Sequence, residues 1–210
     1  YFLFMTFGYF IFATTMRQAI ALSLIIIAFE QIKKKKMMLF IIFVILASTF
    51  HYSALIFLPA YWFDKFKFNK KTIFLIIGLT IFIFVLRKHI GLFILGFNKN
   101  EYLITETGGY FLLLFYVAFL ILGILYKKNF IINSLNNKML FYFIAATIAL
   151  IPLAKINPAF FRITNYYSIF IILYIPNLIA SISDKGTKSI IFICMIALGL
   201  FYFYYKIPSY

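Results

Sequence analysis

The sequence predicts an all-α protein, a polytopic transmembrane helical bundle with about nine membrane helices including short hairpin pairs. Apolar residues fill 65% of 210 positions, charged residues only 12%, and Lys and Arg gather between the apolar runs. Soluble domains carry about twice that share of charge. The apolar runs do not alternate with polar residues, which argues against a membrane β-barrel. Helices satisfy their own backbone hydrogen bonds in lipid, so we expect helices throughout.

The first 63 residues predict four short helices arranged as two hairpins. Tyr1–Ile32 is too long for one ordinary span, and Arg17 near its centre would be costly in lipid. We therefore expect a helical pair that turns near Thr14–Arg17. Met37–Phe63 holds 27 residues, and it forms either one long tilted span or a second pair that turns at Phe50–Ser53.

The distribution of basic residues favours the second hairpin. With the hairpin, and leaving Arg17 aside, 13 Lys and Arg fall on the inner side and 6 on the outer side. A single crossing gives 10 and 9, and the positive-inside rule favours the larger asymmetry. Because the basic residues lie between the spans, the net charge of +15 indicates membrane topology and no nucleic-acid partner. The segments expected inside are Lys33–Lys36, Lys65–Lys71, Lys127–Lys138 and Lys185–Lys188.

The rest of the chain predicts five full spans. Each is a run of about 15–17 residues without charge, and its flanks extend it to the length of helix that a bilayer requires. We expect a single transmembrane domain over residues 1–210, with external loops near residues 14–18, 51–53, 88–109 and 155–165. The chain opens at Tyr1 without a Met or a charged leader, so we expect an N-terminally truncated protein. The five runs are Thr72–Leu86, Phe111–Tyr126, Met139–Leu153, Tyr167–Ile182 and Ser189–Tyr205.

Three basic side chains in or beside apolar sequence are candidates for function. Arg17 is either a snorkelling residue at the interface or an anion clamp, because a guanidinium binds phosphate through two donors. His51 is either a satisfied core residue or a general base or phosphate donor that Ser53 orients. If a helix begins near Pro158, Arg162 shares one face with Asn165 and Tyr166, and that face suits a phosphate or sugar hydroxyls. A plain interfacial belt is the alternative for Arg162.

The acids are too few and too scattered to predict a metal site. Glu101, beside Tyr102, and Glu106 are the only acids of the expected outer face, and they are either solvated or in contact with a sugar or Arg162. The sequence holds no phosphate-binding loop, no dinucleotide turn and no nucleophile elbow. We therefore expect no metal and no cofactor.

Two motifs in the first quarter of the chain carry a family resemblance. Arg17-Gln18-x-x-Ala21 is followed about thirty residues later by Phe50-His51-x-Ser53-Ala54, and Arg162-x-x-x-Tyr166 comes later. This pattern resembles the EpsG family, a branch of the Wzy-like exopolysaccharide polymerases, from the start of the chain to about Ile182.

The resemblance implies a bacterial cytoplasmic membrane enzyme whose active site faces outward. Such a glycosyltransferase joins polyprenyl-diphosphate-linked repeat units, as donor and acceptor, into exopolysaccharide, capsule or O-antigen beside a flippase and a chain-length regulator. A lipid-linked oligosaccharide flippase and a membrane O-acyltransferase are the alternatives. The residues expected to act are His51, Arg17 and Arg162 in catalysis, and Gln18, Ser53, Glu101, Tyr102, Asn165 and Tyr166 in substrate binding.

Overall fold

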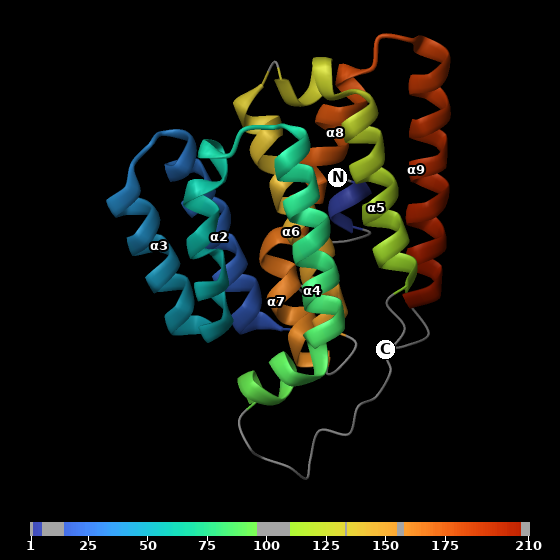
Figure 1. Cartoon of the computed structure of the whole chain (residues 1–210). Coiled ribbons are helices and arrows are strands. Elements are labelled where there is room, and N and C mark those ends of the chain that lie inside the picture. The colour runs from blue at the N-terminus through green and yellow to red at the C-terminus, as the bar shows by residue number, and fades with distance from the viewer. Residues whose placement is uncertain (1, 6–14, 96–109, 133, 155–157, 207–210) are drawn as a thin grey trace.

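The computed structural model describes residues 2–5, 15–95, 110–132, 134–154 and 158–206, and every named element in these ranges is a helix (Figure 1). The all-α prediction is therefore confirmed. The α-helices are α2 (Met16–Lys33), α3 (Met37–Phe50), α4 (Lys70–Leu95), α5 (Tyr110–Leu125), α6 (Leu135–Ala154), α7 (Pro158–Ser168), α8 (Ile171–Ser181) and α9 (Lys185–Lys206). A 3₁₀ helix, η2 (Tyr52–Lys65), and a short π-helix, η3 (Lys128–Ile132), complete the set.

Fewer helices than the predicted nine reach the length and apolar character of a membrane span. Within the described ranges three do so: Lys70–Ile90, Leu135–Ala154 and Phe160–Ser181. Met37–Phe50 and Leu112–Leu125 are apolar but shorter. The prediction of about nine membrane helices is therefore not confirmed: the helix expected as a full span over Phe111–Tyr126 is too short, as is Met37–Phe50 in the hairpin.

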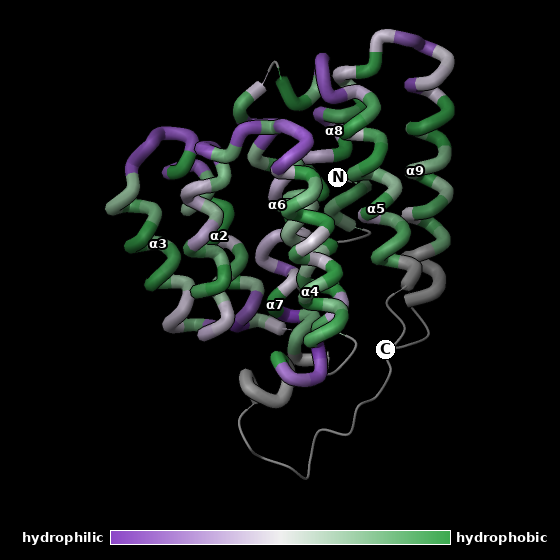
Figure 2. Tube along the Cα trace, viewed as in Figure 1, coloured by the Kyte–Doolittle hydropathy of each residue, from purple (hydrophilic) through white to green (hydrophobic). Residues whose placement is uncertain are grey.

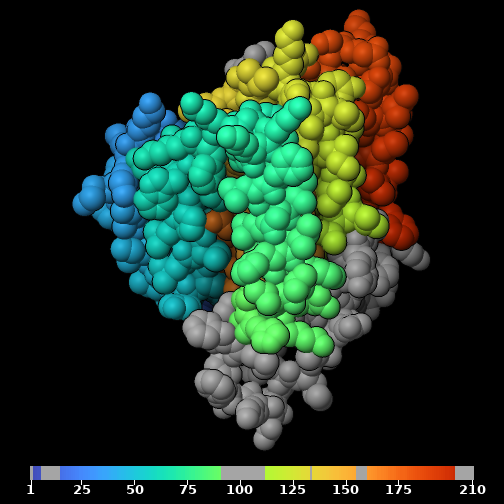
Figure 3. All heavy atoms as spheres, in the orientation of Figure 1, coloured from blue at the N-terminus to red at the C-terminus, as the bar shows by residue number. Residues whose placement is uncertain are grey.

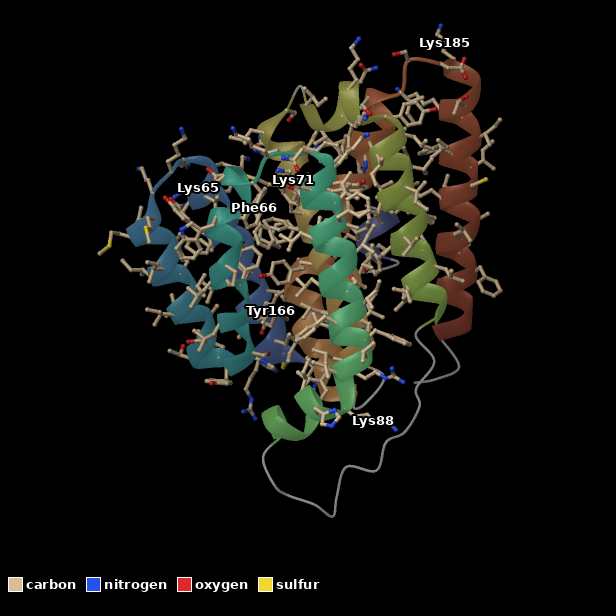
Figure 4. The ribbon with its side chains drawn as sticks, in the orientation of Figure 1. Lys65, Phe66, Lys71, Lys88, Tyr166 and Lys185 are labelled. Atoms are coloured by element: carbon tan, nitrogen blue, oxygen red, sulfur yellow. The ribbon has the colours of Figure 1, made fainter. Side chains whose placement is uncertain are left out.

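The segment that admitted two interpretations is a hairpin. α3 and η2 run antiparallel and meet at His51, so both ends of Met37–Phe63 lie at the same end of the bundle (Figure 1). Lys65, Lys71 and Lys185 lie at that end, whereas Lys88 lies at the opposite end (Figure 4). The tube in Figure 2 is hydrophilic in the connections at the lysine-rich end and hydrophobic along most of the helices between the ends.

A run of lysines forms the turn between α2 and α3. The backbone N–H of Lys36 donates to the carbonyl of Gln31 and that of Lys35 donates to the carbonyl of Ile32, both at 2.9 Å. These two bonds are the Schellman pattern that closes a helix and satisfies its last carbonyls. Lys35 occupies the left-handed position with φ of 56°, where glycine is the usual residue. Beside the turn, Lys33 pairs with Glu30 at 2.7 Å, as the helical spacing predicts.

The core is aromatic and centres on α6. Most side chains of α6 are buried, and Phe143 packs against Phe170 and Phe57 with ring centroids 4.7 and 5.4 Å apart. α4, in contrast, packs on α6 but keeps most of its apolar side chains exposed. Figure 3 shows α4 as a ridge along the bundle, separated from η2 over much of its length by a narrow hollow in which orange atoms of a later helix are visible.

The predicted span Tyr167–Ile182 begins earlier than expected and is interrupted. α7 begins at Pro158, where the fixed φ of proline suits the first turn of a helix. α7 ends at Ser168, and α8 begins at Ile171 after a turn closed by the N–H of Phe170 to the carbonyl of Tyr167 at 3.3 Å. α7 is therefore a short helix of its own, with its first turns at the end of the bundle opposite the lysine-rich connections (Figure 1).

Candidate functional site

His51 is held at the turn between α3 and η2 by its own backbone. Its φ of −149° and ψ of 106° are extended, so the chain leaves α3 at this residue and starts η2 at the next. The His51 N–H donates to Ala47 and the His51 carbonyl accepts from Ala54, at 3.0 and 2.9 Å. The half-buried imidazole lies with Nδ1 at 2.7 Å from the Ser53 Oγ. Ser53 is thus the partner of His51, as the sequence predicts.

Arg17 and Gln18 lie in the first turn of α2, with opposite exposure. Arg17 is exposed, whereas the Gln18 side chain is only 1% exposed. The Gln18 Nε2 donates to the backbone carbonyl of Arg162 at 2.8 Å, and its Oε1 accepts from Thr15 Oγ1 at 3.3 Å. Both ends of the Gln18 amide are therefore bound to protein, and one of them fixes α2 to α7 at Arg162.

Arg162, Asn165 and Tyr166 come from α7 at helical spacing. Arg162 is exposed, while Asn165 is 4% exposed and Tyr166 is fully buried. The buried Asn165 Oδ1 and the Tyr166 hydroxyl have no hydrogen bond of good geometry, although Ser53 lies beside that hydroxyl. Buried polar atoms without a partner are uncommon and point to a ligand or to bound water.

Two independent observations bring α2, the α3–η2 turn and α7 together around His51. The ring centroids of His51 and Tyr166 are 6.3 Å apart. Burial, and then the positive charges of Arg162 and Arg17, hold the pKa of the His51 imidazole below its usual value. The bond from Gln18 to the Arg162 carbonyl brings the first turn of α2, which carries Arg17, to the same part of α7. The first turn of α2, the turn between α3 and η2 and the first turns of α7, which carry these three residues, lie at the end of the bundle opposite Lys65 and Lys185 (Figures 1 and 4).

Tyr167, which was not among the predicted site residues, joins two elements of the site. Its hydroxyl donates to the carbonyl of Ile56 at 2.6 Å and thereby joins α7 to η2. In a 3₁₀ helix that carbonyl would accept from the N–H three residues later, but this position is Pro59, which has no N–H. The signal in the sequence was thus Pro59, since a proline inside a helix leaves a carbonyl that another group must satisfy.

Two of the predicted substrate-binding residues, Glu101 and Tyr102, lie outside the described residues. Among those that are described, no group of three or more His, Cys, Asp or Glu side chains lies close enough to hold a metal ion. The chemistry available at this site is therefore two guanidinium groups, one imidazole and the polar groups of Ser53, Asn165 and Tyr166.

The sequence matches the EpsG family over residues 1–209. The chain belongs to the EpsG family. The match extends beyond Ile182, where the recognised motifs end, and it covers essentially the whole chain. No curated protein and no solved structure matches the sequence. Membership of the EpsG family, together with the apolar helices, indicates a membrane protein of the polysaccharide-polymerase type.

Proposed function

We propose that this EpsG-family chain transfers a polyprenyl-diphosphate-linked glycan onto a second lipid-linked repeat unit and so builds an exopolysaccharide, capsule or O-antigen chain. The observation that carries the proposal is that α7, which carries Arg162, contacts both Gln18 beside Arg17 and the ring of His51. Two fixed cations beside a base match the needs of a reaction that releases a diphosphate and deprotonates a hydroxyl.

The reaction that fits these groups is a glycosyl transfer. The acceptor hydroxyl oxygen forms a bond to the anomeric carbon of the donor, while the bond from that carbon to the diphosphate oxygen breaks. The electron pair of the broken bond leaves with the lipid diphosphate, and His51 takes the hydroxyl proton. Arg17 and Arg162 offset the negative charge on the departing group, and their charge is independent of pH because a guanidinium does not deprotonate in proteins.

The remaining residues divide into positioning and contact roles. Gln18, whose amide is bound to protein at both ends, positions Arg162 and does not contact the substrate. Asn165 offers a buried carbonyl oxygen without a partner, which suits a sugar hydroxyl of the donor or acceptor. Glu101 and Tyr102 remain proposed sugar contacts from the external loop.

We place this site on the outer face of a bacterial cytoplasmic membrane, where a flippase delivers the repeat unit and a chain-length regulator acts on the product. The lysine-rich connections then lie in the cytoplasm, as the positive-inside rule requires. Cysteines substituted for the exposed Lys67 and Lys88, with Cys194 replaced, test the topology. An impermeant thiol reagent on intact cells should label position 88 and not position 67, and the reverse result would invert the topology.

The decisive experiment is polymerisation by the purified protein from a lipid-diphosphate-linked repeat unit. Arg17→Lys and Arg162→Lys retain the charge but lose the two-donor geometry, and each should lower the rate by about 10²–10³-fold. Arg87→Lys is the matched control, since Arg87 donates to the carbonyl of Phe84 in its own helix, at 2.8 Å. Normal polymerisation by both site variants would refute the proposed diphosphate clamp.

A further inference from the structure

His51, Ser53 and Tyr166 lie in a row, and the proposed function assigns a role only to His51. The Ser53 Oγ is 2.7 Å from the His51 Nδ1, and Ser53 is also the side chain beside the Tyr166 hydroxyl. Tyr166 is fully buried, and its ring centroid is 6.3 Å from that of His51. The imidazole of His51 and the hydroxyl of Ser53 thus lie next to a phenol that is at least 113 residues away in the chain.

Each ring nitrogen of His51 has a different environment. Nδ1 is committed to Ser53, so Nε2 is the nitrogen available to a substrate. The neutral imidazole carries its single proton on one nitrogen or on the other, and only an unprotonated Nε2 can accept a proton from a hydroxyl. Whether His51 is a base or a neutral donor to phosphate therefore depends on which way the hydrogen bond with Ser53 runs.

We propose that Ser53 and Tyr166 are positioning residues that fix the tautomer of His51, with Nδ1–H donating to Ser53, the Ser53 hydroxyl donating to Tyr166, and the Nε2 lone pair left for the acceptor. The chemical use of this arrangement rests on the proposed function. The tautomer itself is a property of the protein without substrate and is measurable by itself.

Geometry and charge together favour this direction of the hydrogen bonds. The buried Tyr166 hydroxyl, which lacks a well-placed partner, can accept from Ser53 while Ser53 accepts from Nδ1–H, and the short contact of Nδ1 with Ser53 leaves Nε2 for the substrate. The charged groups acting on the imidazole are Arg162 of α7 and Arg17 of α2, and both are positive. A positive field stabilises a lone pair relative to an N–H bond that points into it.

The proton balance of the step is simple. The acceptor hydroxyl gives its proton to Nε2 as its oxygen bonds to the anomeric carbon, and the ring becomes an imidazolium with two N–H groups. Nδ1–H continues to donate to Ser53, so no proton moves along the row. The diphosphate between the two arginines supplies the negative charge that stabilises the imidazolium.

Nitrogen-15 NMR of histidine-labelled protein tests the tautomer directly. The exposed His89 is replaced by Gln, which leaves one imidazole in the chain. We expect His51 protonated at Nδ1 and unprotonated at Nε2 at neutral pH, and a shift toward the Nε2–H form in Ser53→Ala and in Tyr166→Phe. Ser53→Thr retains a hydroxyl and should restore the original tautomer.

Tyr174→Phe is the matched control for Tyr166→Phe. It removes the hydroxyl of an equally buried tyrosine on α8, and it breaks a hydrogen bond to Phe119 of α5 that lies outside the site. It should therefore lower thermal stability without changing the tautomer of His51. Protonation of Nε2 in the parent protein, or an unchanged tautomer in both Ser53→Ala and Tyr166→Phe, would overturn the proposal.

Kinetics separate this proposal from the proposed function. A general base contributes about 10²–10⁴-fold, so Ser53→Ala and Tyr166→Phe should lower kcat by up to that factor while KM changes little. If the tautomer behaves as expected and no lipid-linked repeat unit is polymerised, the positioning role stands and the proposed function fails. If polymer forms but kcat is the same in both variants, the positioning role fails and the function stands.

Discussion

Replacing Gln18 by Leu removes one hydrogen bond between the two helices that carry the arginines of the site. Gln18 is 1% exposed, and its Nε2 donates to the carbonyl of Arg162 at 2.8 Å. Leu has a similar volume and no polar atom, so the packing of α2 on α7 is largely retained. The change also removes the longer bond from Thr15 in the same turn, at 3.3 Å, but only the bond to Arg162 joins α2 to α7 and bears on the placement of Arg162 relative to Arg17.

The magnitude follows from what the carbonyl of Arg162 keeps. It lies inside α7, where the N–H four residues later is the usual partner of a helical carbonyl, so it is not left bare. The loss is then the net value of one neutral hydrogen bond, about 0.5–1.5 kcal/mol. If the transition state loses all of this stabilisation, the rate of polymerisation falls by about 2- to 13-fold, because about 1.36 kcal/mol corresponds to a factor of ten.

The assay is polymer formation per folded protein, with thermal unfolding measured on the same samples. Tyr174→Phe is the control, because it also removes a buried bond from a side chain to a backbone carbonyl, that of Phe119 at 3.0 Å, between α8 and α5. Tyr174→Phe should lower stability by a similar amount and leave the rate of polymer formation per folded protein unchanged. A rate equal to the parent in Gln18→Leu would refute the positioning role, and a loss beyond about 100-fold would make Gln18 a direct substrate contact.

Three further predictions concern pH, packing and the first turn. Burial and two positive charges lower the pKa of the His51 imidazole below 6.5, so the rate of polymerisation should fall only as pH drops through that lower value. Arg17→Gln removes one of the two charges, so NMR titration of this variant should show a higher pKa for the imidazole. A Cβ at Gly123 would collide with the Tyr174 hydroxyl, so Gly123→Ala should cost about 1–3 kcal/mol of stability, and Tyr174→Phe should relieve part of it in a double-mutant cycle of thermal unfolding. Lys35→Gly should raise the free energy of unfolding by up to about 1 kcal/mol, since Lys35 has a φ of 56°, and no gain would show that the left-handed position costs lysine little.

The local part of the fold and site could be predicted from the sequence. The count of basic residues on the two sides favours the turn at His51, and the spacing of Arg162 and Tyr166 places both on α7. The break at the end of α7 was not predictable, because Ile169 and Phe170 continue an apolar run and hydropathy carries no signal of a helix end inside such a run.

The contacts that unite the site depend on pairs far apart in the chain. Gln18 and Arg162 are 144 residues apart, and Tyr167 and Ile56 are 111 apart. A single sequence shows which residue types are unusual in an apolar segment, but it does not show which backbone carbonyl each will meet. Gln18 was therefore expected to bind substrate, whereas its amide is bound to protein.

The shortness of α3 has a consequence for the lipid around the protein. Its 14 residues span about 21 Å, against about 30 Å for the hydrocarbon core of a bilayer. With the lysine turn held at one water interface, the His51 end lies about 9 Å short of the other, or the bilayer thins there by a similar amount. Membranes with longer acyl chains would increase this mismatch beside the imidazole. The rate of such an enzyme would then depend on bilayer thickness, through the distance a sugar headgroup must sink to reach the base.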